Sequence, residues 1–219
     1  MSGQPARVPV AVLASGSGSN LQALLDACAA PDFPARVALV LSNRAEAFAL
    51  ERARRAGVPA LHLPRRKDLP REAHDQAMVA AMQAHGVRWV CLAGYMLLVT
   101  PVLLEAFPGR VLNIHPALLP AFKGLHAQEQ ALAQGVRVAG ATVHLVTPGI
   151  AEGPIVCQGA VPVLPDDDAD ALKARILGVE HRLYPMALRW AVEGRLHVEG
   201  RKVRVDLRPG ESTSLAMGF

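Results

Sequence analysis

The sequence predicts an α/β fold: a mostly parallel, twisted sheet that carries helices on both faces, with mixed strands in its C-terminal part. Strand-like and helix-like patterns alternate along the first two thirds of the chain, and the strand-like runs are short and apolar. Repeated strand–helix units give parallel strands, whose sheet is covered on both faces. After Gly135 the pattern changes to consecutive strands, so the sheet is expected to become mixed there.

Local signals predict the N-terminal elements in order. Val8–Ala14 is an apolar run that predicts a buried first strand, and Asn20–Ala30 carries leucines at helical spacing. Several later helix-like runs end at glycine, and one begins with Pro101 at a favourable first-turn position. The other strands expected in this half are Arg36–Leu41, Val58–Leu63, Val87–Ala93 and Val111–His115. The other helices expected are Ala45–Ala56, Arg71–His85, Pro101–Phe107 and Gln128–Gln134.

The C-terminal elements are expected to be two long strands, a long helix and a hairpin. His144, inside the first of these strands, is interpreted as a structural residue. Acidic residues before the long helix are interpreted as capping groups, because carboxylates favour the positive end of the helix dipole; they are Asp166, Asp167, Asp168 and Asp170. The expected elements are the strands Val138–Val146 and Ile155–Val163, the connecting loop Thr147–Pro154, a helix within Asp166–Glu193, and a hairpin of Arg195–Glu199 with Lys202–Asp206.

The chain of 219 residues fits a single domain, which we expect over residues 1–208. This domain divides into an N-terminal half, about 1–110, and a C-terminal half, about 111–208. Residues 209–219 are polar and contain glycine and serine, so they are expected to form a mobile tail.

Composition argues for a protein that binds small molecules. The net charge is +4 and aromatic residues make up 4% of the chain, which leaves little to stack nucleic-acid bases on. The three cysteines are far apart in apolar stretches, which indicates reduced, buried thiols in the cytoplasm, and no clustered His/Cys set predicts a metal site. The apolar run Val8–Ala14 is too short to span a membrane. We therefore expect small-molecule substrates and no nucleic-acid or membrane partner; a homodimer is compatible with the sequence.

A loop of small residues, Ser15–Asn20, joins the first strand to the first helix. Such a loop lets backbone N–H groups surround an anion at a helix N-terminus. The dinucleotide fingerprint would need a glycine three residues after Gly18, where the chain has Leu21, and the lysine of a P-loop is also missing. The loop therefore predicts a cradle for a monophosphate or another small anion. A plain turn with Asn20 as helix N-cap is the alternative.

The strand Val111–His115 ends with an amide and an imidazole two residues apart, before Pro116 stops the strand. Alternate side chains of a strand point the same way, so Asn113 and His115 can face one pocket. An amide that donates to a developing oxyanion, beside an imidazole that moves protons, is a minimal apparatus for acyl transfer. A capping asparagine and a hydrogen-bonded structural histidine would be the alternative.

Six segments, in matching order and spacing, carry a family resemblance. They are Ser15–Ala23, Leu92–Met96, Asn113–Pro120, Gly124–His126, Gly140–His144 and Glu180–Pro185. On these residues the chain resembles the folate-dependent glycinamide ribonucleotide formyltransferases of purine biosynthesis. The resemblance implies a Rossmann-like fold whose N-terminal half binds phosphate and whose C-terminal half carries catalysis and the folate site.

The resemblance also implies residue roles. It implies transfer of a formyl group from 10-formyltetrahydrofolate to the amine of glycinamide ribonucleotide, with no metal and no covalent intermediate. Asn113 would stabilise the oxyanion and His115 would act as general acid and base. The substrate phosphate and ribose would be held by Gly18, Ser19, Asn20 and Glu180. The folate would bind to Arg71, Met96, Leu97, Leu98, Val99 and Asn113. The alternatives are a solvated Glu180, a surface Arg71 and an apolar core segment at 96–99.

Two positions depart from the family pattern. The family has an aspartate where this chain has Ala151, and that carboxylate pairs with the catalytic histidine and favours its charged form. Glu152, the next residue, either takes over that catalytic task or points to solvent. Leu97 stands where many relatives have an arginine, so a charged contact to the folate is missing here.

Two other functions stay open. A formyltetrahydrofolate hydrolase uses a similar catalytic block, but such hydrolases usually carry an additional N-terminal regulatory domain, whereas here the anion loop begins within twenty residues of the N-terminus. A catalytically impaired folate- or nucleotide-binding protein would fit the two departures. Binding of both ligands without turnover distinguishes it from the enzyme.

Overall fold

The computed structural model describes residues 6–149 and 151–218. Residues 1–5, 150 and 219, which fall in the expected domain, loop and tail, lie outside the described residues. The N-terminal elements are β1 (Val8–Leu13), α1 (Ser19–Ala29), β2 (Ala35–Ser42), α2 (Phe48–Arg55), β3 (Ala60–His62), α3 (Arg71–Ala84), β4 (Trp89–Leu92), α4 (Pro101–Ala106) and β5 (Val111–His115). The C-terminal elements are α5 (Ala127–Ala133), β6 (Val138–Leu145), β7 (Ile155–Pro162), α6 (Ala169–Val192), β8 (Leu196–Glu199), β9 (Lys202–Val205) and β10 (Ser214–Ala216).

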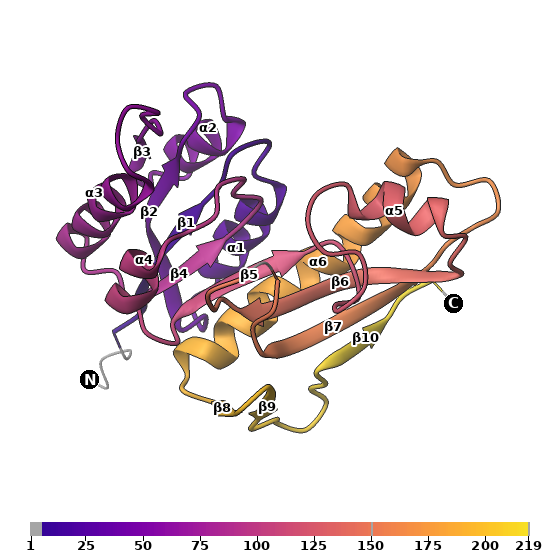
Figure 1. Cartoon of the computed structure of the whole chain (residues 1–219). Coiled ribbons are helices and arrows are strands. Elements are labelled where there is room, and N and C mark those ends of the chain that lie inside the picture. The colour runs from indigo at the N-terminus through magenta and orange to yellow at the C-terminus, as the bar shows by residue number, and fades with distance from the viewer. Residues whose placement is uncertain (1–5, 150, 219) are drawn as a thin grey trace.

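One mixed sheet organises the molecule (Figure 1). Its eight strands lie in the order β10-β7-β6-β5-β4-β1-β2-β3, and β8 and β9 form a separate hairpin. Every pair from β3 to β5 is parallel, as the repeated strand–helix units predicted, while β5–β6 and β6–β7 are antiparallel. The predicted α/β class and the change to a mixed sheet in the C-terminal part are confirmed.

Two hydrophobic cores lie on opposite faces of the sheet. Successive residues of β1 alternate between them: Val10 and Val12 belong to one core, Ala11 and Leu13 to the other. Buried side chains of α1, α2 and α6 fill the first core, and those of α3 and α4 fill the second. This two-sided burial explains why the parallel strands are apolar throughout instead of alternating with polar residues.

Helix α6 contacts both the antiparallel strands β6 and β7 and the parallel strands β4 and β5. It packs against β6 and β7, and its fully buried Tyr184 reaches across to the strands beneath. The Tyr184 hydroxyl lies 2.9 Å from the carbonyl oxygen of Leu92 and 3.1 Å from that of Leu112. These carbonyls belong to β4 and β5, so one side chain holds the long helix over the strands that lead into the cavity described below.

Most predicted boundaries differ from the structure by one or two residues, and a few differ by more. β3 and β4 are shorter than expected, and α2 begins later than expected because a turn at Arg44–Ala47 precedes it. The tail expected to be mobile contains β10, which pairs in parallel with β7, so that expectation is wrong for Ser214–Ala216. A strand this short gives no alternating pattern, and its pairing partner lies far away in the sequence. Arg195 donates a hydrogen bond to Glu211 and so fixes the chain that leads into β10.

None of the helices within the described ranges is both long and apolar enough to cross a membrane.

Candidate active site

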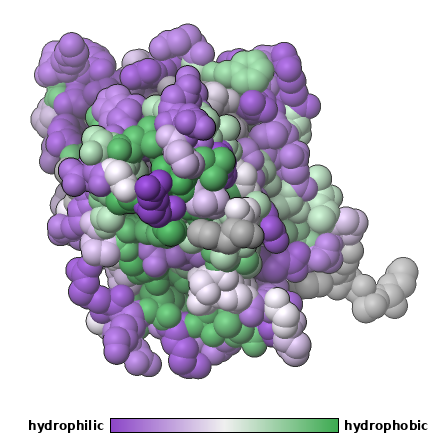
Figure 2. All heavy atoms as spheres, turned by 90° about the vertical axis from the view of Figure 1, so that its right-hand side faces the viewer, coloured by the Kyte–Doolittle hydropathy of each residue, from purple (hydrophilic) through white to green (hydrophobic). Residues whose placement is uncertain are grey.

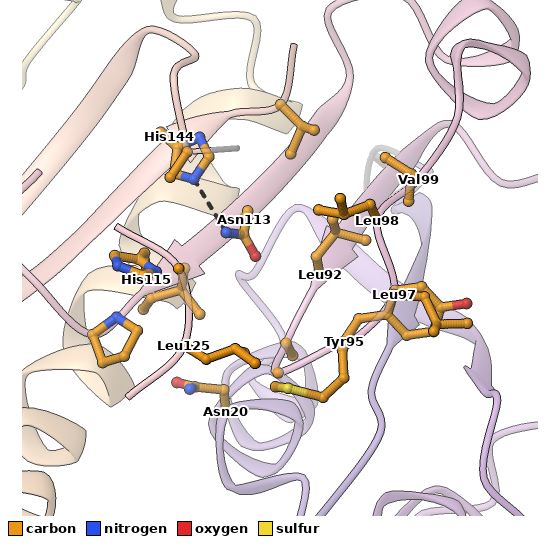
Figure 3. A pocket seen from close by; sticks show the side chains of 18 of the residues that line it. Asn20, Leu92, Tyr95, Leu97, Leu98, Val99, Asn113, His115, Leu125 and His144 are labelled. Carbon is orange, nitrogen blue, oxygen red and sulfur yellow. Dashed lines mark hydrogen bonds between the residues drawn. The ribbon is translucent and has the colours of Figure 1, made fainter. Parts of the chain in front are cut away.

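A cavity of about 1010 Å³ lies at the carboxyl ends of β1, β4 and β5, where ligands bind in open α/β sheets (Figure 3). The structure brings together in this cavity every residue that the sequence assigned to the site. They are Gly18, Ser19, Asn20, Arg71, Met96, Leu97, Leu98, Val99, Asn113, His115, Glu152 and Glu180.

Two hydrogen bonds from α2 hold the loop Ser15–Asn20, called the anion loop below. The backbone N–H of Ala49 donates to the carbonyl of Gly16 at 3.1 Å, and Arg52 donates to the carbonyl of Ser17 at 2.8 Å. Gly18 has a positive φ of 72°, and a Cβ there would lie 2.8 Å from the Ala49 backbone. The close approach of α2 therefore requires glycine at this position.

Asn20 does not cap the first helix, contrary to the alternative interpretation of this loop. The N-cap is Gly18, and Asn20 lies inside α1. The Asn20 Nδ2 atom donates to Glu180 Oε2 at 2.7 Å, and both side chains are buried. The contact fixes the beginning of α1 against the middle of α6.

Glu180 is a buried carboxyl group, not the solvated one that the alternative interpretation required. Burial raises its pKa to about 7, against the opposing effects of the Asn20 hydrogen bond and the Lys173 charge. Lys173 lies seven residues earlier on the same face of α6 and also lines the cavity. Sequence analysis missed it, although its spacing from Glu180 could have identified it.

Asn113 is oriented by a histidine of the neighbouring strand. β5 and β6 are antiparallel in a register that places Asn113 opposite His144. His144 Nδ1 donates to the Leu145 carbonyl at 2.9 Å, so its Nε2 accepts from Asn113 Nδ2 at 3.1 Å. The amide keeps its second N–H for a ligand, and Figure 3 shows its oxygen on the side away from His144. His144 is thus a structural residue, as expected, that acts directly on the candidate catalytic amide.

His115 is 7% exposed, and among the described residues its side chain makes one hydrogen bond, from Nε2 to the carbonyl of Phe122 at 2.8 Å. A carbonyl only accepts, so Nε2 carries the proton and Nδ1 of the neutral ring is a proton acceptor. Burial lowers the pKa of His115, and the bond to Phe122 opposes that shift. The ring is therefore neutral near pH 7 and suited to accept a proton.

The segment that carries the Phe122 carbonyl is anchored by two polar residues of β6 and β7. Thr142 accepts from the backbone N–H of Leu119 at 3.0 Å and donates to the carbonyl of Ala117 at 2.7 Å. Gln158 donates to the Leu119 carbonyl and to the Thr142 hydroxyl, both at 3.0 Å. His115 is thus held through a partly buried network that sequence analysis did not identify.

Glu152 lies at the cavity but does not contact His115 within the described residues. Its carboxylate forms an ion pair with Lys123 at 3.1 Å, and its side chain is 54% exposed. Its neighbour Ala151 has a positive φ of 51°, a conformation that asparagine and aspartate adopt more readily than alanine. The backbone at 151 therefore has a conformation that would suit the aspartate that the resemblance leads one to expect there.

The segment 96–99 forms an apolar edge of the cavity, and its last residue, Val99, also packs against the second core. Met96 and Leu98 are 52% and 51% exposed, and Leu125 also lines the cavity (Figure 3). Arg71 donates to the carbonyl of Leu98 at 3.0 Å, so its side chain contacts this segment and does not simply extend into solvent. On the side of the molecule that Figure 2 shows, apolar side chains gather around a hollow bordered by hydrophilic ones. Exposed apolar surface next to polar groups is typical of a ligand site.

The cysteines are free and buried. Burial raises the pKa of Cys91 and of Cys157 to about 12, so these free thiols are poor nucleophiles. Throughout residues 6–149 and 151–218, no group of three or more His, Cys, Asp or Glu side chains could hold a metal ion.

An anion loop, an apolar edge and an amide–imidazole pair at the carboxyl edge of an α/β sheet define a group-transfer site. The comparisons with known proteins agree: the model of the family described as "Formyl transferase" matches residues 8–188, and the chain belongs to this family. The resemblance found in the sequence is therefore confirmed.

Named relatives are similar over most of this chain. It is 40% identical to the phosphoribosylglycinamide formyltransferase of Escherichia coli over 90% of the chain and 93% of that protein. It is 45% identical to the trifunctional purine biosynthetic protein adenosine-3 of Drosophila melanogaster over 86% of the chain, which spans 14% of that longer protein. The crystal structure of glycinamide ribonucleotide transformylase 1 from Symbiobacterium toebii matches with a TM-score of 0.91 and 56% identity, over 94% of this chain and 97% of that one.

Replacement of Gly18 by alanine should destabilise the protein by about 2 kcal/mol or more, because the new Cβ would meet the Ala49 backbone and φ would stay positive. Gly16→Ala is the matched control: it lies in the same loop, and its Cβ would meet nothing within 4 Å. We expect that variant to stay within about 0.5 kcal/mol of the wild type. Urea unfolding of the three proteins measures both values, and equal stability of the two variants would contradict the close approach of α2.

The pKa of Glu180 predicts how stability depends on pH. Between the ordinary pKa of 4.5 and about 7, the folded chain holds more protons at this site than the unfolded chain. The free energy of unfolding should therefore fall as the pH rises through this window, on the order of 2–3 kcal/mol for this group. Melting curves from pH 4.5 to pH 8 test this. Glu180→Gln should flatten the dependence and the exposed control Glu199→Gln should not; identical curves for both variants would refute the assignment.

Proposed function

We propose that this protein transfers a formyl group from 10-formyltetrahydrofolate to the amine of glycinamide ribonucleotide. The observation that carries the proposal is the single cavity lined by the anion loop, the apolar segment 96–99 and the Asn113–His115 pair. A phosphorylated substrate, a flat folate and a reacting carbonyl require three different surfaces, and this cavity offers all of them. The named relatives support the same reaction.

We propose that the phosphate lies on the backbone N–H groups of Gly18, Ser19 and Asn20, where the N-terminus of α1 favours an anion. Lys173 adds a positive charge from the same side of the cavity as Glu180. Glu180, held by Asn20, accepts hydrogen bonds from the ribose hydroxyls. The folate lies against Met96, Leu97, Leu98 and Val99, beside Arg71 and Asn113.

The chemical step needs an oxyanion donor and a proton carrier. The glycyl amine attacks the formyl carbon, and the free N–H of Asn113 donates to the oxygen that becomes negative. His115 Nδ1 accepts the proton that the amine loses and returns it to the folate nitrogen that departs. Both side chains are fixed beforehand, by His144 and by Phe122, so little reorganisation is needed.

The proposed reaction also implies a set of reactants and a cellular location. We propose small-molecule substrates as the only reactants, with no metal, and a cytoplasmic location in which the three buried thiols stay reduced. A homodimer stays a prediction, which light scattering of the purified protein would check.

Formyl transfer from 10-formyltetrahydrofolate to glycinamide ribonucleotide by the purified protein tests the proposal directly. Asn113→Ala should lower kcat by about 100- to 1,000-fold, as loss of an oxyanion donor does. His115→Ala should lower it by about 100- to 10,000-fold, as loss of a general base does. Unchanged melting temperatures would show that the fold is intact. Wild-type rates in both variants would refute the mechanism, and binding of both ligands by the wild type without turnover would favour the impaired binder.

The missing aspartate predicts a specific pH profile. Because burial lowers the pKa of His115 and no carboxylate opposes it, the neutral base should persist below pH 6.5, its ordinary value, and kcat/KM should fall only at lower pH. Ala151→Asp should favour the protonated ring and shift this acid limb upward by about one pH unit or more. Ala151→Asn is the uncharged control and should leave the limb in place.

Glu152→Gln completes this comparison. Since Glu152 pairs with Lys123 and not with His115, we expect the variant to keep its kcat within a few-fold and its acid limb unchanged. A collapse of activity in Glu152→Gln would show instead that Glu152 performs the task of the missing aspartate when ligands are bound.

A further inference from the structure

The segment that forms the apolar edge of the cavity has no regular structure of its own. Residues 95–100 lie between β4 and α4, outside any helix or strand. Met96 and Leu98 are about half exposed, so the middle of this stretch has little burial to hold it in one shape, whereas Tyr95 and Val99 pack against the second core. An irregular segment with little burial opens easily, unless hydrogen bonds from a neighbouring element hold it.

Helix α3 supplies such contacts from a single face. Arg71, His74 and Asp75 are related by i, i+3 and i+4, which places them side by side on the helix. Their partners are distributed along the whole segment. Arg71 donates to the carbonyl of Leu98 in its middle, His74 hydrogen-bonds Tyr95 at its beginning and Asp75 accepts from Thr100 at its end.

The contact at the end of the segment is the most deeply buried. Asp75 is 3% exposed, and its Oδ2 accepts from the backbone N–H of Thr100 at 2.5 Å. Thr100 is the N-cap residue of α4, so this carboxylate fixes the point where the segment becomes helical. Removal of the acceptor would leave a buried N–H group without a partner, which favours opening of the segment.

The contact at the beginning of the segment joins two side chains. His74 Nε2 and the Tyr95 hydroxyl are 2.9 Å apart, and the Tyr95 hydroxyl also donates to the sulfur of Met78 at 3.4 Å. His74 and Met78 are both buried on α3. Tyr95 is thereby turned toward α3, while the next residue, Met96, faces the cavity.

We propose that His74 and Asp75 are positioning residues that hold segment 95–100 in the shape that receives the formyl donor. They act through Tyr95 and Thr100, respectively. The donor affinity is then set partly by α3, whose two residues do not themselves line the cavity. This inference rests on the proposed function for the identity of the ligand, but the bracing of the segment by α3 does not. A segment held in shape before binding loses less conformational entropy when the ligand arrives.

Hydrogen–deuterium exchange of the ligand-free protein tests the bracing directly. Tyr95→Phe removes one oxygen atom and Asp75→Ala removes the buried acceptor, so exchange in peptides that cover 95–100 should accelerate about tenfold or more in each. Exchange at 111–115, which lies in β5, should not change. Gln76→Ala is the matched control, because Gln76 is exposed on the same helix. Acceleration spread over the whole chain, or none in either variant, would overturn the proposal.

Steady-state kinetics test the consequence for the ligand. We expect KM for 10-formyltetrahydrofolate to rise about tenfold in Tyr95→Phe and Asp75→Ala, while kcat and KM for glycinamide ribonucleotide stay within about twofold. Asp75→Asn retains an acceptor oxygen and should restore most of the affinity. An equal rise in both KM values would indicate a merely structural role and would overturn the inference.

The two proposals fail in different ways. If the wild type neither binds nor uses the formyl donor, the proposed function is wrong, and the exchange rates still decide whether α3 braces the segment. If the wild type is active and both Tyr95→Phe and Asp75→Ala match it in KM and in exchange, the inference about α3 is wrong and the proposed function stands. Should Asp75→Ala fail to fold, Tyr95→Phe alone decides.

Discussion

The antiparallel pairing of β5 with β6 is the constraint on which the site depends. β5 is the last parallel strand of the N-terminal half, and the sheet changes direction at its outer edge. In this register, Asn113 lies opposite His144 and His115 lies opposite Thr142. His144 orients the amide of Asn113 directly. Thr142 anchors the segment that follows β5, and the carbonyl of Phe122 in that segment holds the His115 imidazole. A shift of one residue would turn these side chains to the other face, so the ladder specifies the geometry of the chemistry.

The second requirement is that the anion loop be held at the right place relative to β5. Tyr184 of α6 reaches the carbonyls of β4 and β5, and Glu180, four residues earlier, binds Asn20 at the start of α1. The same helix therefore fixes both the strand with the reacting groups and the loop that would hold the phosphate. Positioning two reactants in one geometry accounts for a large part of the rate in such transfers.

Sequence patterns predicted most of this arrangement, because the relevant signals are local. β5 was predicted residue for residue, since an apolar run leads into it and Pro116 ends it. All the assigned site residues line the cavity, because the carboxyl ends of neighbouring strands meet at one edge. β10, the orientation of Glu152 and the contacts of His74 could not be predicted. Each depends on a partner distant in the sequence, at Gln158, Lys123 and Tyr95, and periodicity carries no information about such partners.

The two departures from the family pattern lie on irregular segments and not on the β5–β6 ladder. Ala151 belongs to the loop between β6 and β7, and Leu97 to the segment between β4 and α4. Substitution on such segments leaves the ladder register untouched, so the positions of Asn113 and His115 are kept while the charges around them change. At the first site Ala151 brings no carboxylate, and its positive φ is a conformation that asparagine and aspartate adopt more readily. At the second site, Leu97 carries no charge, and the nearby guanidinium is that of Arg71 on α3. Arg71 donates to the carbonyl of Leu98, so it also holds the segment 95–100 in place. The rigid ladder thus carries Asn113 and His115, while Ala151 and Leu97 lie on irregular segments that neighbouring elements must hold in place.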